Sequence, residues 1–196
     1  MKKNKKLFVL VALFLAVFAV GGTLAYLTDT TQTTTNTFTF GKVDIELNEG
    51  NWNAQNATDL EPGATVAKQP TVTVETGSKD AFVFIEVTMP AQVNGKDVLT
   101  HDTIDTTKWT VVSTSGTTTV YAYGTSSAMT KVSANGSTPA LFNTITVNNT
   151  LNGTDVTAIG NNGLDITVKA YAIQADSLAS NTPSAVWTTL QGALAP

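Results

Sequence analysis

A continuous apolar run, residues 81–87, places the strongest constraint on how this chain can fold. Nearly every side chain in it is apolar, including Phe82, Phe84 and Ile85, so a strand here must be buried on both faces of its sheet. Elsewhere apolar residues alternate with polar ones, a pattern that buries one face of a strand. Many short strands with little helix predict an all-β protein, specifically an antiparallel β-sandwich. The predicted core residues are Phe82, Phe84, Ile85, Val87, Ile145, Val147, Ile166 and Val168.

Turn and strand-breaking residues divide the first half of the pattern. Residues 38–47 read as one strand with a bulge at Gly41, because the apolar residues on its two sides are out of phase. Glu61-Pro62-Gly63 predicts a type II turn with glycine at the positive-φ position. Pro70 indicates an edge strand or a strand break. Asn94-Gly95 predicts a tight turn.

The second half of the chain continues the strand pattern and ends in a helix. Residues 109–112 and 118–123 predict a hairpin, after a short helical turn at residues 102–108. Residues 139–147 read as a lead-in and strand, residues 148–154 as a loop, and residues 165–171 as an alternating strand. Pro183 suits the first turn of a helix, and Val186, Trp187 and Leu190 recur at helical spacing. A short C-terminal helix is therefore predicted.

The N-terminus has the three parts of a bacterial export signal. Four lysines within residues 2–6 precede an apolar stretch, residues 7–20, and small residues lead to Ala25. We predict cleavage between Ala25 and Tyr26. The alternative is a retained membrane anchor, but the apolar stretch is short for a span of about 20 residues. The predicted organisation is a signal peptide at 1–25, an N-terminal arm at 26–37 and a β-sandwich domain at 38–196.

Composition fits a secreted β-protein. Cysteine is absent, so packing and hydrogen bonds must hold the exported domain without disulfides. Charged residues are only 13% of the chain, about half the usual quarter, and threonine takes their place. The formal net charge is −4, and the chain contains no arginine. These features exclude a nucleic-acid partner.

Residues with catalytic or metal-binding chemistry are scarce. The chain has a single histidine, His101, and no H-E-x-x-H sequence, whereas a zinc peptidase needs about three protein ligands. We interpret His101 as an exposed loop residue. Asp44 and Glu46 read as the solvent face of a strand, with Glu49 nearby, and no serine lies in a G-x-S-x-G sequence. No catalytic residue, metal ligand or cofactor is predicted.

A covalent crosslink is a further alternative. Lys68 and Lys169 fall in strand-like segments, and asparagine is abundant, so a Lys–Asn isopeptide bond is a hypothesis that the loss of one ammonia from the intact mass would test. We interpret both lysines as solvated edge residues.

Several short segments resemble one family of exported proteins. They are Gly22-Thr23-Leu24-Ala25 with Tyr26-Leu27-Thr28-Asp29, then Asn36-Thr37-Phe38-Thr39-Phe40-Gly41-Lys42-Val43-Asp44-Ile45, Leu60-Glu61-Pro62-Gly63 through Lys68-Gln69-Pro70, and Lys169-Ala170-Tyr171-Ala172-Ile173-Gln174-Ala175-Asp176. The first resembles precursors cut by the SipW-type signal peptidase. The others resemble the TasA/camelysin (CalY) family of Gram-positive bacteria.

This resemblance implies a jelly-roll-like sandwich, secretion to the cell surface or matrix, and assembly into extracellular biofilm fibres. It implies that the mature N-terminal segment of one subunit adds as a strand to the next. Here that segment is residues 26–36, and the assembly residues would be Tyr26, Leu27, Thr28, Asp29, Thr30 and Thr31. Its partners would be other copies of the chain, the SipW-type signal peptidase during export, and an accessory assembly protein.

Three alternatives stay open at this point. Residues 26–36 could be a disordered leader, since exposed polar arms are common at chain termini. The camelysin branch carries a metallo-endopeptidase name, so a cell-surface metallo-endopeptidase is a second function. A monomeric surface or spore-associated adhesin is a third.

Overall fold

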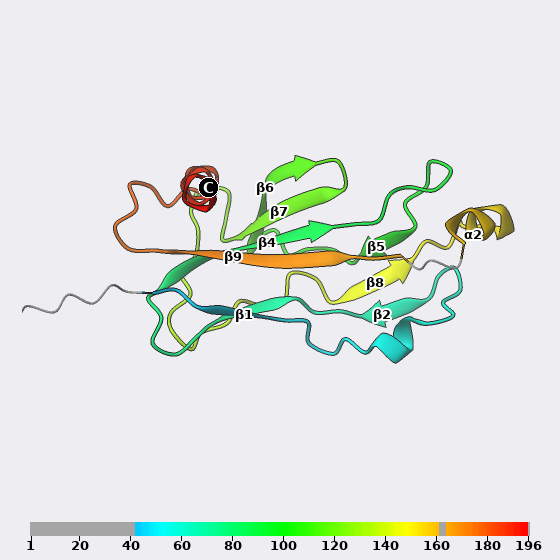
Figure 1. Ribbon diagram of the computed structural model, residues 1–196, viewed down its shortest axis with the longest axis horizontal. Helices are drawn as coiled ribbons and strands as arrows, with labels where there is room; N and C mark the ends of the chain where they lie inside the picture. The colour runs from blue at the N-terminus through cyan, green and yellow to red at the C-terminus, as the bar shows by residue number, and fades with distance from the viewer. Residues whose placement is uncertain (1–41, 161–163, 196) are drawn as a thin grey trace, which may run out of the picture. The chain divides into compact units, whose positions relative to one another are not determined.

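The computed structural model describes residues 42–160 and 164–195, which all belong to one compact unit. Its main sheet has four antiparallel strands in the order β6-β7-β4-β9 (Figure 1). These are β4 (Ala81–Thr88), β6 (Trp109–Ser115), β7 (Thr118–Tyr123) and β9 (Thr167–Gln174). The predicted hairpin is confirmed as β6 and β7, with a register shift after Val111. The predicted signal peptide, the arm and Gly41 lie outside the described residues.

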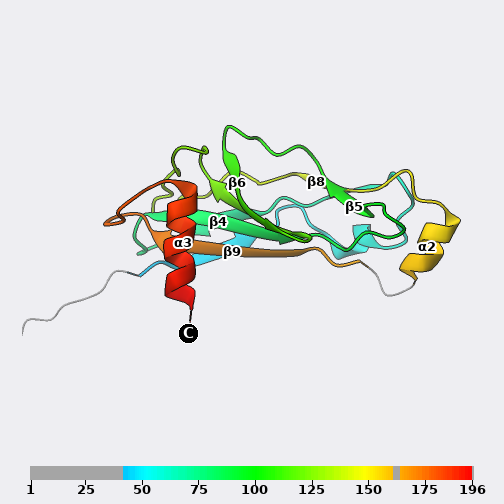
Figure 2. The ribbon, with the colours of Figure 1, turned by 90° about the horizontal axis from the view of Figure 1, so that it is seen from above.

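Strand β4 is the buried centre of this sheet. It pairs with β7 on one side and β9 on the other, and Phe82, Phe84 and Ile85 are almost completely buried. Helix α3 (Pro183–Leu194) covers one face, where Val186, Trp187 and Leu190 pack against Phe82 and Phe84 (Figure 2). The central strand and the C-terminal helix are both confirmed. The run is apolar at successive positions because α3 covers the face that a two-layer sandwich would leave in water.

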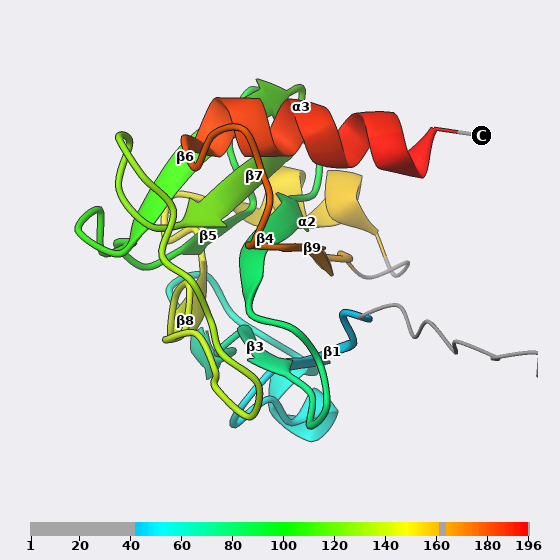
Figure 3. The ribbon, with the colours of Figure 1, turned by 90° about the vertical axis from the view of Figure 1, so that its left-hand side faces the viewer.

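The second layer lies on the opposite face of the main sheet (Figure 3). It consists of a two-stranded sheet, β1-β3, and a three-stranded sheet, β2-β8-β5. The strands are β1 (Ile45–Asn48), β2 (Thr65–Ala67), β3 (Thr71–Val74), β5 (Leu99–His101) and β8 (Thr144–Val147). All paired strands are antiparallel, so the all-β sandwich with a C-terminal helix is confirmed.

Proline and glycine act where the sequence predicted. Pro70 lies between β2 and β3, which belong to different sheets, so it marks a strand break. Gly63 has φ +89°, and the Ala64 N–H donates to the Glu61 carbonyl at 2.9 Å, as in a type II turn. Asn94 and Gly95 both have positive φ, and they join the Val93–Lys96 bridge as a tight turn.

Six of the eight predicted core residues are buried, and two are not. Ile166 and Val168 are only half-buried, although they pack against the core. Ile166 lies just before β9 and Val168 lies on it, and β9 is the outermost strand of its sheet in the described part of the chain. A residue at a sheet edge has neighbours on one side only, so strict alternation does not guarantee full burial.

A second helix was missed by the sequence analysis. The predicted loop at residues 148–154 ends in α2 (Gly153–Ile159). The Asn152 side chain accepts hydrogen bonds from the Thr154 and Asp155 N–H groups, and the Asp155 side chain accepts one from the Asn152 N–H. This reciprocal cap stabilises a short helix that has little apolar periodicity. Within residues 42–160 and 164–195, no helix has both the length and the apolarity needed to cross a bilayer.

Candidate functional site

The hydrophobic core is only partly covered on one side, between β1 and β9. These strands lie beside each other in different layers (Figure 1). Ile45 and Leu47 on β1 and Val168 and Ala170 on β9 are packed against the core but only partly buried. No described strand pairs with the outer edge of β9 or of β1. The gap therefore combines unfinished apolar burial with two strand edges whose backbone groups are free to pair.

A hollow follows this open side. We call it the lateral groove, and it is lined by Leu47, Glu49, Trp52, Lys68, Asp165, Ile166, Thr167 and Val168. It continues into a second hollow beside α2 and the 3-10 helix η1 (Ala54–Ala57), which we call the end pocket. Both hollows share Trp52, Lys68, Asp165 and Ile166. The end pocket has a volume of about 590 Å³.

Large apolar side chains border the end pocket without being covered. Trp52 is 39% exposed, Leu60 37% and Val156 49%, and all three line the end pocket. They make up three of the five large apolar residues that the described part of the chain exposes. Clustering of exposed apolar residues around a hollow is typical of a binding surface rather than of scattered surface residues.

A buried lysine lies where the groove and the pocket meet. Lys68 is 5% exposed, its ammonium group forms an ion pair with the Glu49 carboxylate, and it lies 4.6 Å from the centre of the Trp52 ring. The interpretation of Lys68 as a solvated edge residue is therefore wrong, because the alternation of this segment places Lys68 on the same buried face as Val66 and Val72. Lys169 is exposed on β9 and pairs with Glu86, as expected. The isopeptide hypothesis for either lysine stays a prediction.

The turn that positions Trp52 depends on a glycine. Gly50 has φ +59°, and a Cβ atom there would lie 2.7 Å from the Gln69 Cβ. The Gly50 N–H donates to the Asn48 side chain at 2.7 Å, which fixes the end of β1. Both the positive φ and the close approach require glycine, so the chain can turn away from β1 and place Trp52 over Lys68.

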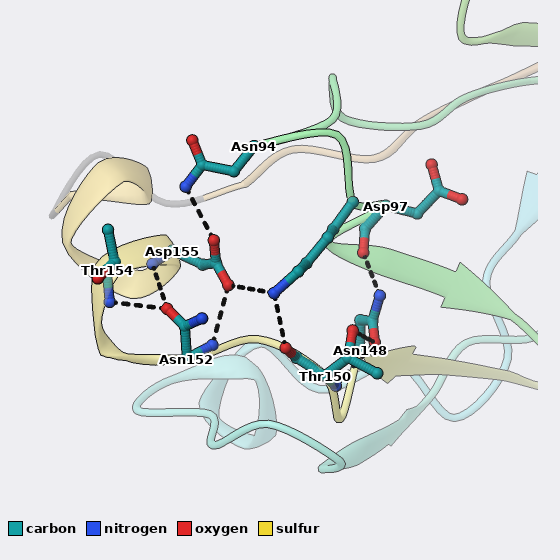
Figure 4. A network of polar contacts seen from close by, with 8 residues as sticks. Asn94, Asp97, Asn148, Thr150, Asn152, Thr154 and Asp155 are labelled. Carbon is teal, nitrogen blue, oxygen red and sulfur yellow. Dashed lines mark hydrogen bonds and ion pairs between the residues drawn. The ribbon is translucent and has the colours of Figure 1, made fainter.

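A buried carboxylate fixes α2 at the end pocket (Figure 4). Asp155 is 2% exposed. It accepts hydrogen bonds from the Lys96 ammonium at 2.7 Å, the Asn94 amide at 2.8 Å and the Asn152 N–H at 3.0 Å. The bonds from Lys96, Asn94 and Asn152 lower the pKa of Asp155 to about 2. Asp155 thereby ties α2 to the tight turn at Asn94-Gly95 and holds Val156 and Ile159 against the pocket.

His101 does not occupy the exposed loop that the sequence predicted. It is half-buried at the end of β5 and stacks on Phe142 with ring centres 5.2 Å apart. Its Nδ1 lies 2.7 Å from the Asp102 carbonyl oxygen, to which it donates. Burial raises the pKa of the Asp102 carboxyl, but N–H groups of Thr144 and Asn143 outweigh that effect and lower it. Both residues therefore serve the packing of β5 against β8.

The structure does not describe any of the sequence-predicted site residues. The cleavage residues Ala25 and Tyr26 and the assembly residues Tyr26, Leu27, Thr28, Asp29, Thr30 and Thr31 are outside the described residues. Asp44, which comes just before β1, and Glu46 on β1 are both exposed, as expected. Sequence reasoning missed Trp52, Leu60 and Val156. The available signal for Trp52 was a lone tryptophan in a polar stretch, residues 48–59, that has no strand pattern.

Comparison with known protein families identifies the family of this chain. Residues 1–114 match the model of the camelysin metallo-endopeptidases. The chain belongs to the camelysin family. The match includes β1 and Trp52, so it covers one wall of the groove, whereas β9 lies beyond it. Camelysins are cell-surface or extracellular proteins. No curated protein matches the chain.

The family name implies a bound metal ion. The described residues of this camelysin do not form a site that fits one. In the part of the chain that the structure describes, no three His, Cys, Asp or Glu side chains come together as a metal site. His101, the one histidine of the sequence, is committed to the Asp102 carbonyl and to Phe142. We therefore derive no metal-dependent step for these residues.

Proposed function

We propose that this camelysin is a secreted structural protein that forms extracellular fibres of a bacterial biofilm matrix. After export and cleavage by a SipW-type signal peptidase, residues 26–36 of one copy add as a strand along the lateral groove of the next. The contact is heterologous, so each added copy presents a new groove and the polymer grows. An accessory protein assists this assembly.

One observation carries the proposal: the core is only partly covered between β1 and β9, and no described strand pairs with the outer edge of either. A strand inserted there would cover the partly buried side chains of Ile45, Leu47 and Val168. It would also pair with the backbone of β1 or β9, which removes an edge that otherwise invites uncontrolled association. The donor segment is rich in threonine, a residue that suits strands, so backbone hydrogen bonds supply much of the contact.

Deletion of residues 26–36 tests the proposal directly. The shortened mature chain should keep its fold, because the described sandwich begins after these residues, and it should stay monomeric. Electron microscopy and sedimentation would compare it with the mature chain that begins at Tyr26. Unchanged fibres from the deletion variant would refute strand exchange, and monomers from both chains would favour the adhesin alternative.

A metallo-endopeptidase is the second candidate, and only the family name favours it. It predicts that the purified chain hydrolyses a casein-like substrate and loses that activity with a chelator or in His101→Ala. We expect no metal-dependent hydrolysis. Chelator-sensitive hydrolysis that is absent from His101→Ala would replace the structural proposal with the enzymatic one.

A further inference from the structure

We propose that the end pocket binds the mature N-terminus of a neighbouring copy, through its α-ammonium group and the side chains of Tyr26 and Leu27. This inference rests on the proposed strand exchange and on cleavage before Tyr26. It gives the donor segment a specific binding site for its first two residues. The rest of the segment has no large apolar side chains to bind its neighbour.

The walls of the end pocket select large apolar side chains. Val98, Val147 and Leu151 form a small buried cluster there, and the exposed Trp52, Leu60 and Val156 surround it. Burying apolar surface is worth about 25 cal/mol per Å², so one aromatic and one aliphatic side chain would be strongly held. Within residues 26–37, Tyr26 and Leu27 are the only large apolar residues.

The charges at the pocket select a cation. Asp59 and Asp165 both line it and are exposed, and neither forms an ion pair within the described part of the chain. Lys68 also lines the pocket, but its charge is balanced by Glu49. A ligand that combines an apolar body with one positive charge therefore complements this site.

The mature N-terminus has this combination. Signal cleavage creates an α-ammonium group that is followed at once by Tyr26 and Leu27. Of the seven lysines beyond the predicted signal, Lys42, Lys68, Lys96, Lys131 and Lys169 pair with carboxylates of their own chain. The other two, Lys79 and Lys108, do not line the end pocket. Capture of an N-terminal amine is a recurring mode of peptide recognition. The α-ammonium group thus pairs with Asp59 and Asp165 while the two side chains fill the pocket.

Cleavage would then control assembly. In the precursor, the nitrogen of Tyr26 is an uncharged amide within the chain and cannot satisfy the two carboxylates. The same chain gains affinity for its neighbours only once the signal peptide is removed, which keeps assembly outside the cell.

The pH dependence of assembly tests this inference. An α-amino group loses its proton near pH 8, so the critical concentration for fibre growth should rise roughly two- to fivefold between pH 7 and pH 9.5. The double variant D59N/D165N should already have a raised critical concentration at pH 7. That concentration should change little between pH 7 and pH 9.5. The control E75Q/D80N removes the same charge from a turn outside the pocket. Its critical concentration should depend on pH as that of the parent does.

Tryptophan quenching gives a second measurement on the same samples. Trp52 is 39% exposed, whereas Trp109 and Trp187 are 1% and 9% exposed, so acrylamide reports mainly on Trp52. Quenching should fall when fibres form. Fibres in which D59N/D165N titrates like the parent would overturn the anchor and leave strand exchange standing. Fibres in which Trp52 stays accessible would contradict both, because Trp52 lines the lateral groove as well as the end pocket. A mature chain that begins at a residue other than Tyr26 would also overturn the anchor, whereas fibre failure in every sample would refute the proposed function itself.

Discussion

At the scale of single residues, Lys68 and Asp155 are the charged residues buried in the described part of the chain, and both are fixed by partners at the end pocket. Lys68 has Glu49 and the Trp52 ring, and Asp155 has Lys96, Asn94 and the Asn152 N–H. Removing a partner from a buried charge is more costly than removing an exposed pair. These residues therefore determine where η1 and α2 stand, and so the shape of the end pocket.

Asp155 makes the stability of this region depend on acid. Its pKa falls from 3.8 to about 2 in the folded chain, so its stabilising effect is complete above pH 3.8 and is lost as the pH falls through 2. D155N should lower the melting temperature at pH 6, and the difference from the parent should shrink as the pH approaches 2. Calorimetry across this range would measure the difference, with D80N as the control, because Asp80 is half-buried and forms no ion pair in the described residues. A difference that stays constant with pH would show that the charge of Asp155 does not matter.

At the scale of elements, α3 determines whether the main sheet is stable. The Trp187 ring lies 5.1 Å from the Phe84 ring and 5.6 Å from the Tyr171 ring. Trp187→Ala should lower the free energy of unfolding by about 3–5 kcal/mol, because it leaves a cavity between helix and sheet. Gln191→Ala on the exposed side of α3 should change it by less than about 0.5 kcal/mol. Urea unfolding followed by circular dichroism would compare the two variants.

Elements with a clear local pattern were predictable from the sequence, and those that depend on the rest of the fold were not. The apolar run of β4 and the spacing of Val186, Trp187 and Leu190 identified the central strand and α3. Helix α2 was missed because a side-chain cap and Asp155 hold it, rather than an apolar face. The groove was also missed, because Trp52, Lys68 and Val168 are far apart in the sequence. Only the packing of the segments around β1 and β2 against the edge strand β9 brings them to one hollow.

At the scale of the whole molecule, strand edges are distributed unevenly around the described unit. The outer edge of β3 is engaged by residues 135–141, through bonds such as Asn135 N–H to the Val74 carbonyl at 2.8 Å and Leu141 N–H to the Pro70 carbonyl at 2.9 Å. Strand β6 is interrupted by a register shift at Val111 and Ser113, and such irregularities discourage pairing. The side between β1 and β9 has no such protection in the described residues.

A charge placed on the side between β1 and β9 should therefore stop assembly. The same charge placed on β6 should not. Val168 points toward the core from β9 and is partly buried, so Val168→Lys would set an ammonium group among the apolar side chains that an added strand must cover, which is how natural edge strands resist pairing. Val111 on β6 is 57% exposed, and Val111→Lys provides the matched control. We expect Val168→Lys to remain a folded monomer by circular dichroism and sedimentation, and Val111→Lys to form fibres like the parent. If Val111→Lys alone blocks fibres, the edge of β6 is the growing surface and the lateral groove is not.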